Sequence, residues 1–119
     1  MTGYAEYKDN SVLTQPPGKL VVMLYDGAIR FLQRAAAALE AGDHPAKAEY
    51  LNKAQAVINE LSNSLDLEAG GEIAANLRAL YEWMSRHLTA AVVRKDPQAI
   101  RDVIACLTDL NEGWKAVAT

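Results

Sequence analysis

The segment from Ser11 to Leu39, and above all its centre between Leu20 and Leu32, constrains the fold of this 119-residue chain more than any other. At about 100° per residue, its apolar side chains form one helical face with a second apolar row beside it. The face contains Leu20, Leu24, Gly27, Ala28, Phe31, Ala35 and Leu39, and the second row contains Val22, Tyr25, Ile29 and Ala36. Together they cover about half of the helical wheel, more than the roughly 100° stripe with which a helix packs on one core. This width predicts either a helix near the centre of the fold or a helix that keeps apolar surface for a partner.

Three further segments repeat the helical spacing, and residues that end helices separate them. We expect helices at about residues 17–40, 44–66, 72–94 and 97–117. Asp43 and Asp96, each followed closely by a proline, are typical of residues that cap a helix start. The paired glycines Gly70 and Gly71 indicate a turn, because glycine interrupts helical patterns.

The lengths of these helices and of their connections determine the predicted architecture. Helices of about 20 residues are roughly 30 Å long, and short connections make successive helices antiparallel neighbours. No segment alternates with the period of two that is typical of strands. The sequence therefore predicts an all-α protein, an antiparallel up-and-down four-helix bundle at residues 17–119, preceded by a flexible N-terminal cap or tail at residues 1–16.

Composition argues against several classes of function. The net charge of −3 and the lack of a basic stripe disfavour nucleic-acid binding. No run approaches the about 20 apolar residues of a membrane span, and the acidic N-terminus does not resemble a secretory signal peptide, so we expect a cytosolic protein. The single cysteine, Cys106, is compatible with a reducing compartment.

Few side chains are arranged for catalysis or for metal binding. A di-metal bundle site needs Glu-x-x-His pairs, and neither His44 nor His87 has one, so we expect no metal and no cofactor. An exposed histidine on a bundle helix is also typical of histidine phosphotransfer domains, which makes His87 an alternative candidate. Those domains carry a lysine and a glycine soon after the histidine, whereas Leu88-Thr89-Ala90 follow here. A solvated histidine explains His87 more simply, and we expect no enzyme.

Apolar residues outside the predicted buried stripes indicate a binding surface instead. Val22 and Ile29 lie at the margin of the first helical face, Met23 lies on its polar side, and Trp83 lies outside the third stripe. Single exposed apolar residues are normal, but together these four favour a groove for an amphipathic or extended apolar segment of a partner. A generic helical adaptor for a secreted or signalling partner would share these bulk features.

Motifs spread over nearly the whole chain give it a resemblance to the flagellar export chaperones of the FliS family. The residues that carry it are Tyr7 with Asn10-Ser11-Val12 and Thr14, Leu20 with Met23-Leu24-Tyr25-Asp26-Gly27-Ala28 and Phe31, Lys53-Ala54-Gln55 with Ile58 and Glu60-Leu61, Leu80-Tyr81 with Met84, and Leu110 with Trp114. The first block is the specific one. Pro16 stands where the family usually has a serine that caps the first helix, and Thr14 is an alternative cap one turn earlier.

The resemblance implies a non-enzymatic cytosolic chaperone that binds the C-terminal segment of flagellin. It implies that the chaperone prevents premature polymerisation, aids delivery to the flagellar type III export apparatus and contacts components of the export gate. It also implies an N-terminal segment that shields the apolar surface while flagellin is absent. The partner-binding residues predicted in this way are Tyr7, Val12 and Thr14 in the tail and Val22, Met23, Tyr25, Ile29, Lys53, Gln55, Ile58 and Trp83 in the groove.

Overall fold

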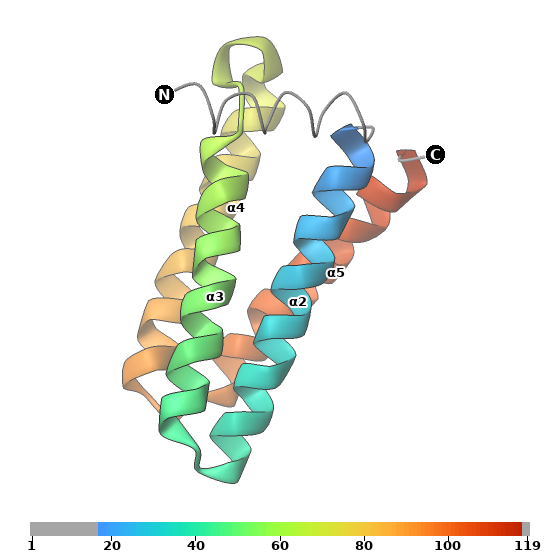
Figure 1. The fold of residues 1–119 in the computed structure, drawn as a ribbon. Coiled ribbons are helices and arrows are strands. Elements are labelled where there is room, and N and C mark those ends of the chain that lie inside the picture. The colour runs from blue at the N-terminus through green and yellow to red at the C-terminus, as the bar shows by residue number, and fades with distance from the viewer. Residues whose placement is uncertain (1–16, 118–119) are drawn as a thin grey trace, which may run out of the picture.

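The computed structural model describes residues 17–117, which form four α-helices. These are α2 (Pro17–Ala41), α3 (His44–Asn63), α4 (Leu67–Val93) and α5 (Pro97–Val117). The helices run alternately up and down: the α2–α3 and α4–α5 connections lie at one end of the molecule, and the α3–α4 connection lies at the other (Figure 1). The predicted antiparallel four-helix bundle is confirmed.

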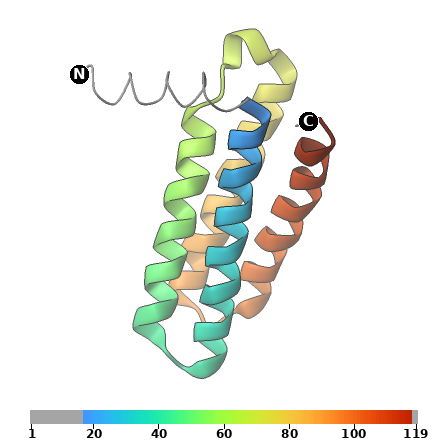
Figure 2. The same cartoon turned by 45° about the vertical axis from the view of Figure 1, so that its right-hand side comes forward.

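Each helix packs against two neighbours, so the four surround one core. α2 contacts α3 and α5, and α4 contacts the same two helices from the opposite side, as the turned view shows (Figure 2). The largest fully buried side chains come from all four helices: Tyr25, Leu32, Leu51, Ile58, Met84, Leu88, Ile100, Leu107 and Val103. α2 is packed most closely against its neighbours, which explains its unusually wide apolar face.

The helix boundaries agree with the predicted ones except around the α3–α4 connection. α3 ends at Asn63 rather than at residue 66, and Asp66 instead caps α4 by accepting a 2.9 Å hydrogen bond from the Ala69 amide. α4 therefore begins at Leu67, one turn before the paired glycines that the sequence pattern marks as a break. Gly71 has φ +53°, a left-handed conformation in which a side chain is strained, so the helix is kinked there and then continues.

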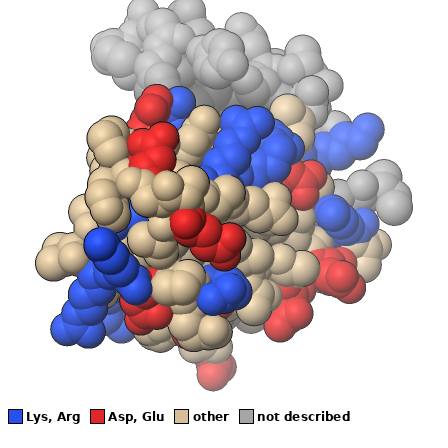
Figure 3. Space-filling view, turned by 90° about the horizontal axis from the view of Figure 1, so that it is seen from below, with Lys and Arg blue, Asp and Glu red and all other residues tan. Residues whose placement is uncertain are grey.

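The end of the bundle that holds the α2–α3 and α4–α5 connections is covered by charges of both signs. Figure 3 shows Lys and Arg interspersed with Asp and Glu on this end. Asp43 caps α3 as predicted, accepting a 3.1 Å hydrogen bond from the Ala46 amide. Lys47 is 5% exposed, and its Nζ donates a 3.2 Å hydrogen bond to the Val92 carbonyl in the last turn of α4. An ammonium in this place interacts favourably with the partial negative charge of a helix C-terminus.

Candidate functional site

An apolar groove opens at the end of the bundle where α2 and α4 begin and α3 and α5 end. Its volume is about 300 Å³, and every helix contributes to its wall. We call it the end groove; it is lined by Val21, Leu61, Ser64, Leu65, Asp66, Gly70, Ile73, Ala74, Leu77, Tyr81 and Trp114. Ile73 is 72% exposed there, so one wall presents apolar surface to solvent. A concave apolar site with few polar groups is the usual form of a binding site in a folded protein.

The kink in α4 shapes this groove. Gly70 and Ala74 both line it, and a Cβ added to Gly70 would lie 2.6 Å from the Cβ of Ala74. The left-handed Gly71 directs the first turn of α4 away from the helix axis that follows. Only glycine gives both the space at residue 70 and the backbone conformation at residue 71 without strain.

Buried polar atoms lie beneath the apolar lining. The hydroxyl groups of Tyr25 and Tyr81 are 2.6 Å apart, and the rings of Tyr25 and Trp114 meet edge to face with centroids 6.3 Å apart. Burial raises the pKa of both tyrosines, because their ionised forms would be desolvated. Asn111, which is 2% exposed, donates a 2.8 Å hydrogen bond to Asp26. The Oδ1 of Asn111 and the Nε1 of Trp114 are buried and have no hydrogen-bond partner among the residues that the structure describes.

A second apolar surface crosses the outside of α2 and α3. Phe31 and Tyr50 stack with ring centroids 6.5 Å apart. The ammonium of Lys53 lies 5.9 Å from the centre of the Phe31 ring and 5.7 Å from that of Tyr50, and the Arg34 guanidinium lies 5.8 Å from Tyr50. These distances are typical of cation–π contacts. The half-buried aromatic pair is thus flanked by two cations.

Two of the predicted groove residues belong to the core instead. Tyr25 is 0% exposed and Ile58 is 1% exposed, so both side chains lie inside this bundle and not on its surface. Ile58 follows the helical spacing of the apolar residues of α3, which is typical of a core position, and Tyr25 belongs to the second apolar row of the first predicted helix. Tyr25 is held by Tyr81, 56 positions further along the chain.

The other predicted residues are spread over different sides of the bundle. Met23 is 55% exposed, and Lys53 is exposed beside the Phe31–Tyr50 pair. Val22 and Ile29 are half-buried and lie one turn from Asp26, which contacts α5, so they face the α2–α5 side.

Five predicted residues remain, two in the bundle and three in the tail. Gln55 in α3 and Trp83 in α4 are half-buried, and Trp83 packs against the core. Tyr7, Val12 and Thr14 lie outside the described residues. Of the eleven predicted residues, the eight that the structure describes do not line the end groove.

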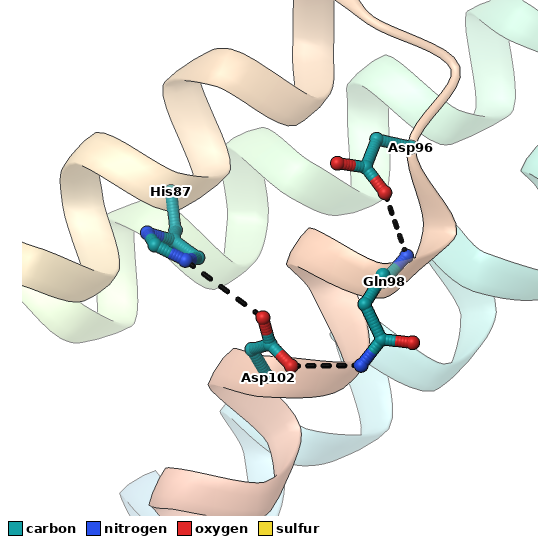
Figure 4. Close-up of polar contacts among 4 residues, drawn as sticks. All are labelled: His87, Asp96, Gln98 and Asp102. Atoms are coloured by element: carbon teal, nitrogen blue, oxygen red, sulfur yellow. Dashed lines mark hydrogen bonds and ion pairs between the residues drawn. The ribbon is translucent and has the colours of Figure 1, made fainter.

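His87 takes part in a polar contact between α4 and α5. Its ring lies on Trp83 with centroids 4.2 Å apart, and its Nε2 is 3.9 Å from an oxygen of Asp102 (Figure 4). The side-chain Nε2 of Gln98 donates a 2.8 Å hydrogen bond to the other carboxylate oxygen of Asp102. The backbone amide of Gln98 donates a 3.0 Å hydrogen bond to the carboxylate of Asp96. The ring of His87 is therefore packed between neighbours, and this contact accounts for the residue without a phosphotransfer role.

Cys106 and the acidic residues show no arrangement for covalent or metal chemistry in the part of the chain from Pro17 to Val117. Burial, with a smaller contribution from Asp109, raises the pKa of the Cys106 thiol, which keeps it in the unreactive protonated form at neutral pH. The described residues contain no group of three or more His, Cys, Asp or Glu placed to hold a metal ion. None of the four described helices is long and apolar enough to span a membrane.

Comparison with known proteins shows which family the chain belongs to. The family model described as "Flagellar protein FliS" matches residues 1–119. The chain belongs to the FliS family. The flagellar secretion chaperone FliS of Salmonella typhimurium is 45% identical over 111 residues, which cover 92% of this chain and 82% of that protein. The Bacillus subtilis chaperone of the same name is 38% identical over 112 residues, covering 94% of this chain and 83% of that protein.

The solved structures support the same fold. A crystal structure of a flagellar chaperone from bacteria superposes with a TM-score of 0.80 at 22% sequence identity, covering 98% of this chain and 94% of that one. This likeness shows the four-helix fold, while the FliS family is a family of chaperones, which are not a class of enzymes.

Proposed function

We propose that this protein is a cytosolic export chaperone that binds the C-terminal segment of flagellin, prevents its premature polymerisation and aids its delivery to the flagellar type III export apparatus. Direct contacts with components of the export gate belong to the same proposal. The observation that carries it is the end groove: a FliS-family bundle that leaves an apolar site of about 300 Å³ open between its four helices. Such a site fits the apolar residues of a segment that would otherwise pack against other copies of itself.

The two apolar surfaces suit a partner that wraps around the bundle. The end groove opens where all four helices meet, and the Phe31–Tyr50 surface lies on the outside of α2 and α3. An unfolded segment can cover both at once, and it gains helix as its apolar side chains are buried. Because ordering the segment costs free energy, a large contact area gives only moderate, reversible affinity, which suits a chaperone that must release its cargo.

The floor of the end groove is uncharged where Tyr81 lines it. A tyrosine is neutral at physiological pH, and burial raises the pKa of Tyr81 further above the ordinary value of 10.0. A neutral floor avoids the cost of placing an apolar side chain against an ion. The groove therefore favours an apolar residue of flagellin over a charged one.

Calorimetric titration with a peptide of about the last 50 residues of flagellin from the same organism, with circular dichroism of the mixture, tests the proposal. We expect binding with a negative heat-capacity change and more helix in the mixture than in the two components added together. A peptide that does not bind, or that binds without burying apolar surface, would contradict it.

Two matched variants on α4 test where the peptide binds. Ile73→Asp places a charge in the wall of the end groove at a side chain that is 72% exposed, so it should weaken binding at least about tenfold with little loss of stability. Val93→Asp makes the same change at a side chain that is 84% exposed at the other end of α4, and it should leave the affinity for this peptide unchanged. Equal affinities for the two variants would show that the end groove is not the binding site.

A further inference from the structure

The outer side of α4 near its C-terminal end holds a hollow that is separate from the end groove. The hollow has a volume of about 510 Å³. We call the six residues that line it the arginine face: Ser85, Arg86, Thr89, Ala90, Val93 and Arg94. A hollow of about 280 Å³ adjoins it and shares Ser85 and Arg86. This second hollow extends along α4 to Glu82 and to Tyr81, which also lines the end groove, and across to Asn59 and Ser62 of α3. The arginine face shares no residue with the end groove and lies toward the opposite end of the bundle, beside the α4–α5 connection (Figure 1).

The arginine face is apolar as well as positively charged. Val93 is 84% exposed, and Ala90 is also at the surface. α4 is packed less closely against its neighbours than α2, so these side chains are not needed to complete the core. One exposed valine would be ordinary, but here apolar residues lie between two cations.

The two arginines have no acidic partner in the part of the chain that the structure describes. Arg78, one turn before Glu82 on the same helix, forms a 3.3 Å ion pair with it, whereas neither Arg86 nor Arg94 is within ion-pair distance of a described carboxylate. The whole protein has a net charge of −3, so an acidic partner is attracted to this locally positive surface and not to the protein in general.

The spacing of the arginines indicates the form of that partner. Arg86 lies in α4 and Arg94 is the residue that follows its last turn, so the two are eight positions apart and about 12 Å apart along the helix axis. Two carboxylates seven or eight residues apart on a helix are separated by nearly the same distance. Apolar side chains between them would then lie over Ala90 and Val93. We infer that the arginine face binds an amphipathic helix of a second protein, whose acidic residues two turns apart pair with Arg86 and Arg94.

This site goes beyond the proposed binding of flagellin, because it is independent of the end groove. Guanidinium groups bind carboxylates through two parallel hydrogen bonds, which gives such pairs both strength and defined geometry. A chaperone carrying cargo in the end groove would keep the arginine face available for the second protein.

The test is a titration of the isotope-labelled full-length chain, followed by nuclear magnetic resonance. The probe is a synthetic helical peptide of about 20 residues with glutamates seven positions apart and leucines between them, and the control peptide has glutamine at those glutamates. We expect amide shifts concentrated between Ser85 and Arg94 and at least about tenfold weaker binding of the glutamine peptide.

A pair of double variants separates a specific site from general attraction. Arg86→Glu with Arg94→Glu should weaken binding of the acidic probe at least about tenfold. Arg30→Glu with Arg101→Glu makes the same change in net charge at two exposed arginines elsewhere and should weaken it less than about twofold. The proposal is wrong if both pairs weaken binding equally, if the largest shifts fall on the end groove, or if no shift occurs at millimolar probe.

Discussion

At the scale of single residues, the contact between Tyr25 and Tyr81 is the most consequential polar interaction of the core. The two hydroxyls are 2.6 Å apart, and the side chains are 0% and 2% exposed. A buried hydroxyl that loses its partner keeps its full desolvation cost without compensation. The pair therefore joins α2 to α4, which do not otherwise pack as neighbours.

Replacing one of these tyrosines should cost more than half of what replacing both costs. Tyr81→Phe leaves the Tyr25 hydroxyl unpaired and should lower the free energy of unfolding by about 1–3 kcal/mol. The double variant Tyr25→Phe with Tyr81→Phe removes both polar groups and should be less destabilised than the sum of the two single variants. Urea unfolding of the four proteins, followed by circular dichroism, measures this; additive losses would mean that the hydroxyls do not stabilise each other.

The raised pKa values of the same pair predict a loss of stability in alkali. Above the ordinary tyrosine pKa of 10.0, the two side chains ionise in the unfolded chain but remain protonated in the folded one. The unfolded state then binds fewer protons, so the free energy of unfolding falls as pH rises, by up to about 1.4 kcal/mol per pH unit for each tyrosine. The double Phe variant should have a shallower slope above about pH 10 in urea titrations at several pH values. An unchanged slope would assign the alkaline loss to other groups.

Sequence reasoning reached the residue scale only in part. Periodicity correctly placed Ala28 and Ala35 on the apolar face of the first predicted helix, and both are 0% exposed. Tyr25 and Ile58 were predicted as partner-binding residues and are buried in this bundle, since the resemblance to a family does not say which side chains another helix covers. Contacts such as the one between Tyr25 and Tyr81 depend on how two distant helices are rotated, and no local pattern carries that information.

At the scale of elements, the start of α4 is the feature that the sequence did not predict. Two adjacent glycines ordinarily mark a break, which would place the helix start after them. In the structure the cap at Asp66 starts the helix earlier, and the positive φ of Gly71 bends it instead of ending it. The other boundaries were predictable, because a capping aspartate and a following proline act within one turn of sequence.

Two glycine substitutions of opposite effect test the kink. Gly71→Ala forces a side chain into the left-handed conformation at φ +53° and should lower the free energy of unfolding by about 1–2 kcal/mol. Gly113→Ala, in α5, meets no atom within 4 Å and should raise it by up to about 1 kcal/mol through better helix propensity. Thermal and urea unfolding give both values. A Gly71→Ala protein as stable as the parent would mean that α4 is not kinked in solution.

At the scale of the whole molecule, the end groove exists only because four helices pack together. Its lining residues come from all four helices, from Val21 to Trp114, and from the α3–α4 connection, so no single helix contains the groove. The sequence supported the bundle because amphipathic spacing is repeated in every helix. The width of the first predicted apolar face left two explanations open, and the close packing of α2 against α3 and α5 accounts for it, so this width did not locate the end groove.

The uneven packing of the bundle predicts an order of local stability that hydrogen exchange can measure. Amides around Tyr25, Ala28 and Leu32 in the closely packed α2 should exchange only through global unfolding, since their side chains are 0% exposed. The first turn of α4, at Leu67–Gly71, lies beyond the kink with exposed side chains and should open at far lower free energy. This turn borders the end groove, so a segment of α4 that opens easily can adjust to different apolar side chains without disturbing the core. Exchange at residues 67–71 as slow as in the centre of α2 would contradict this, because the groove would then be a rigid site.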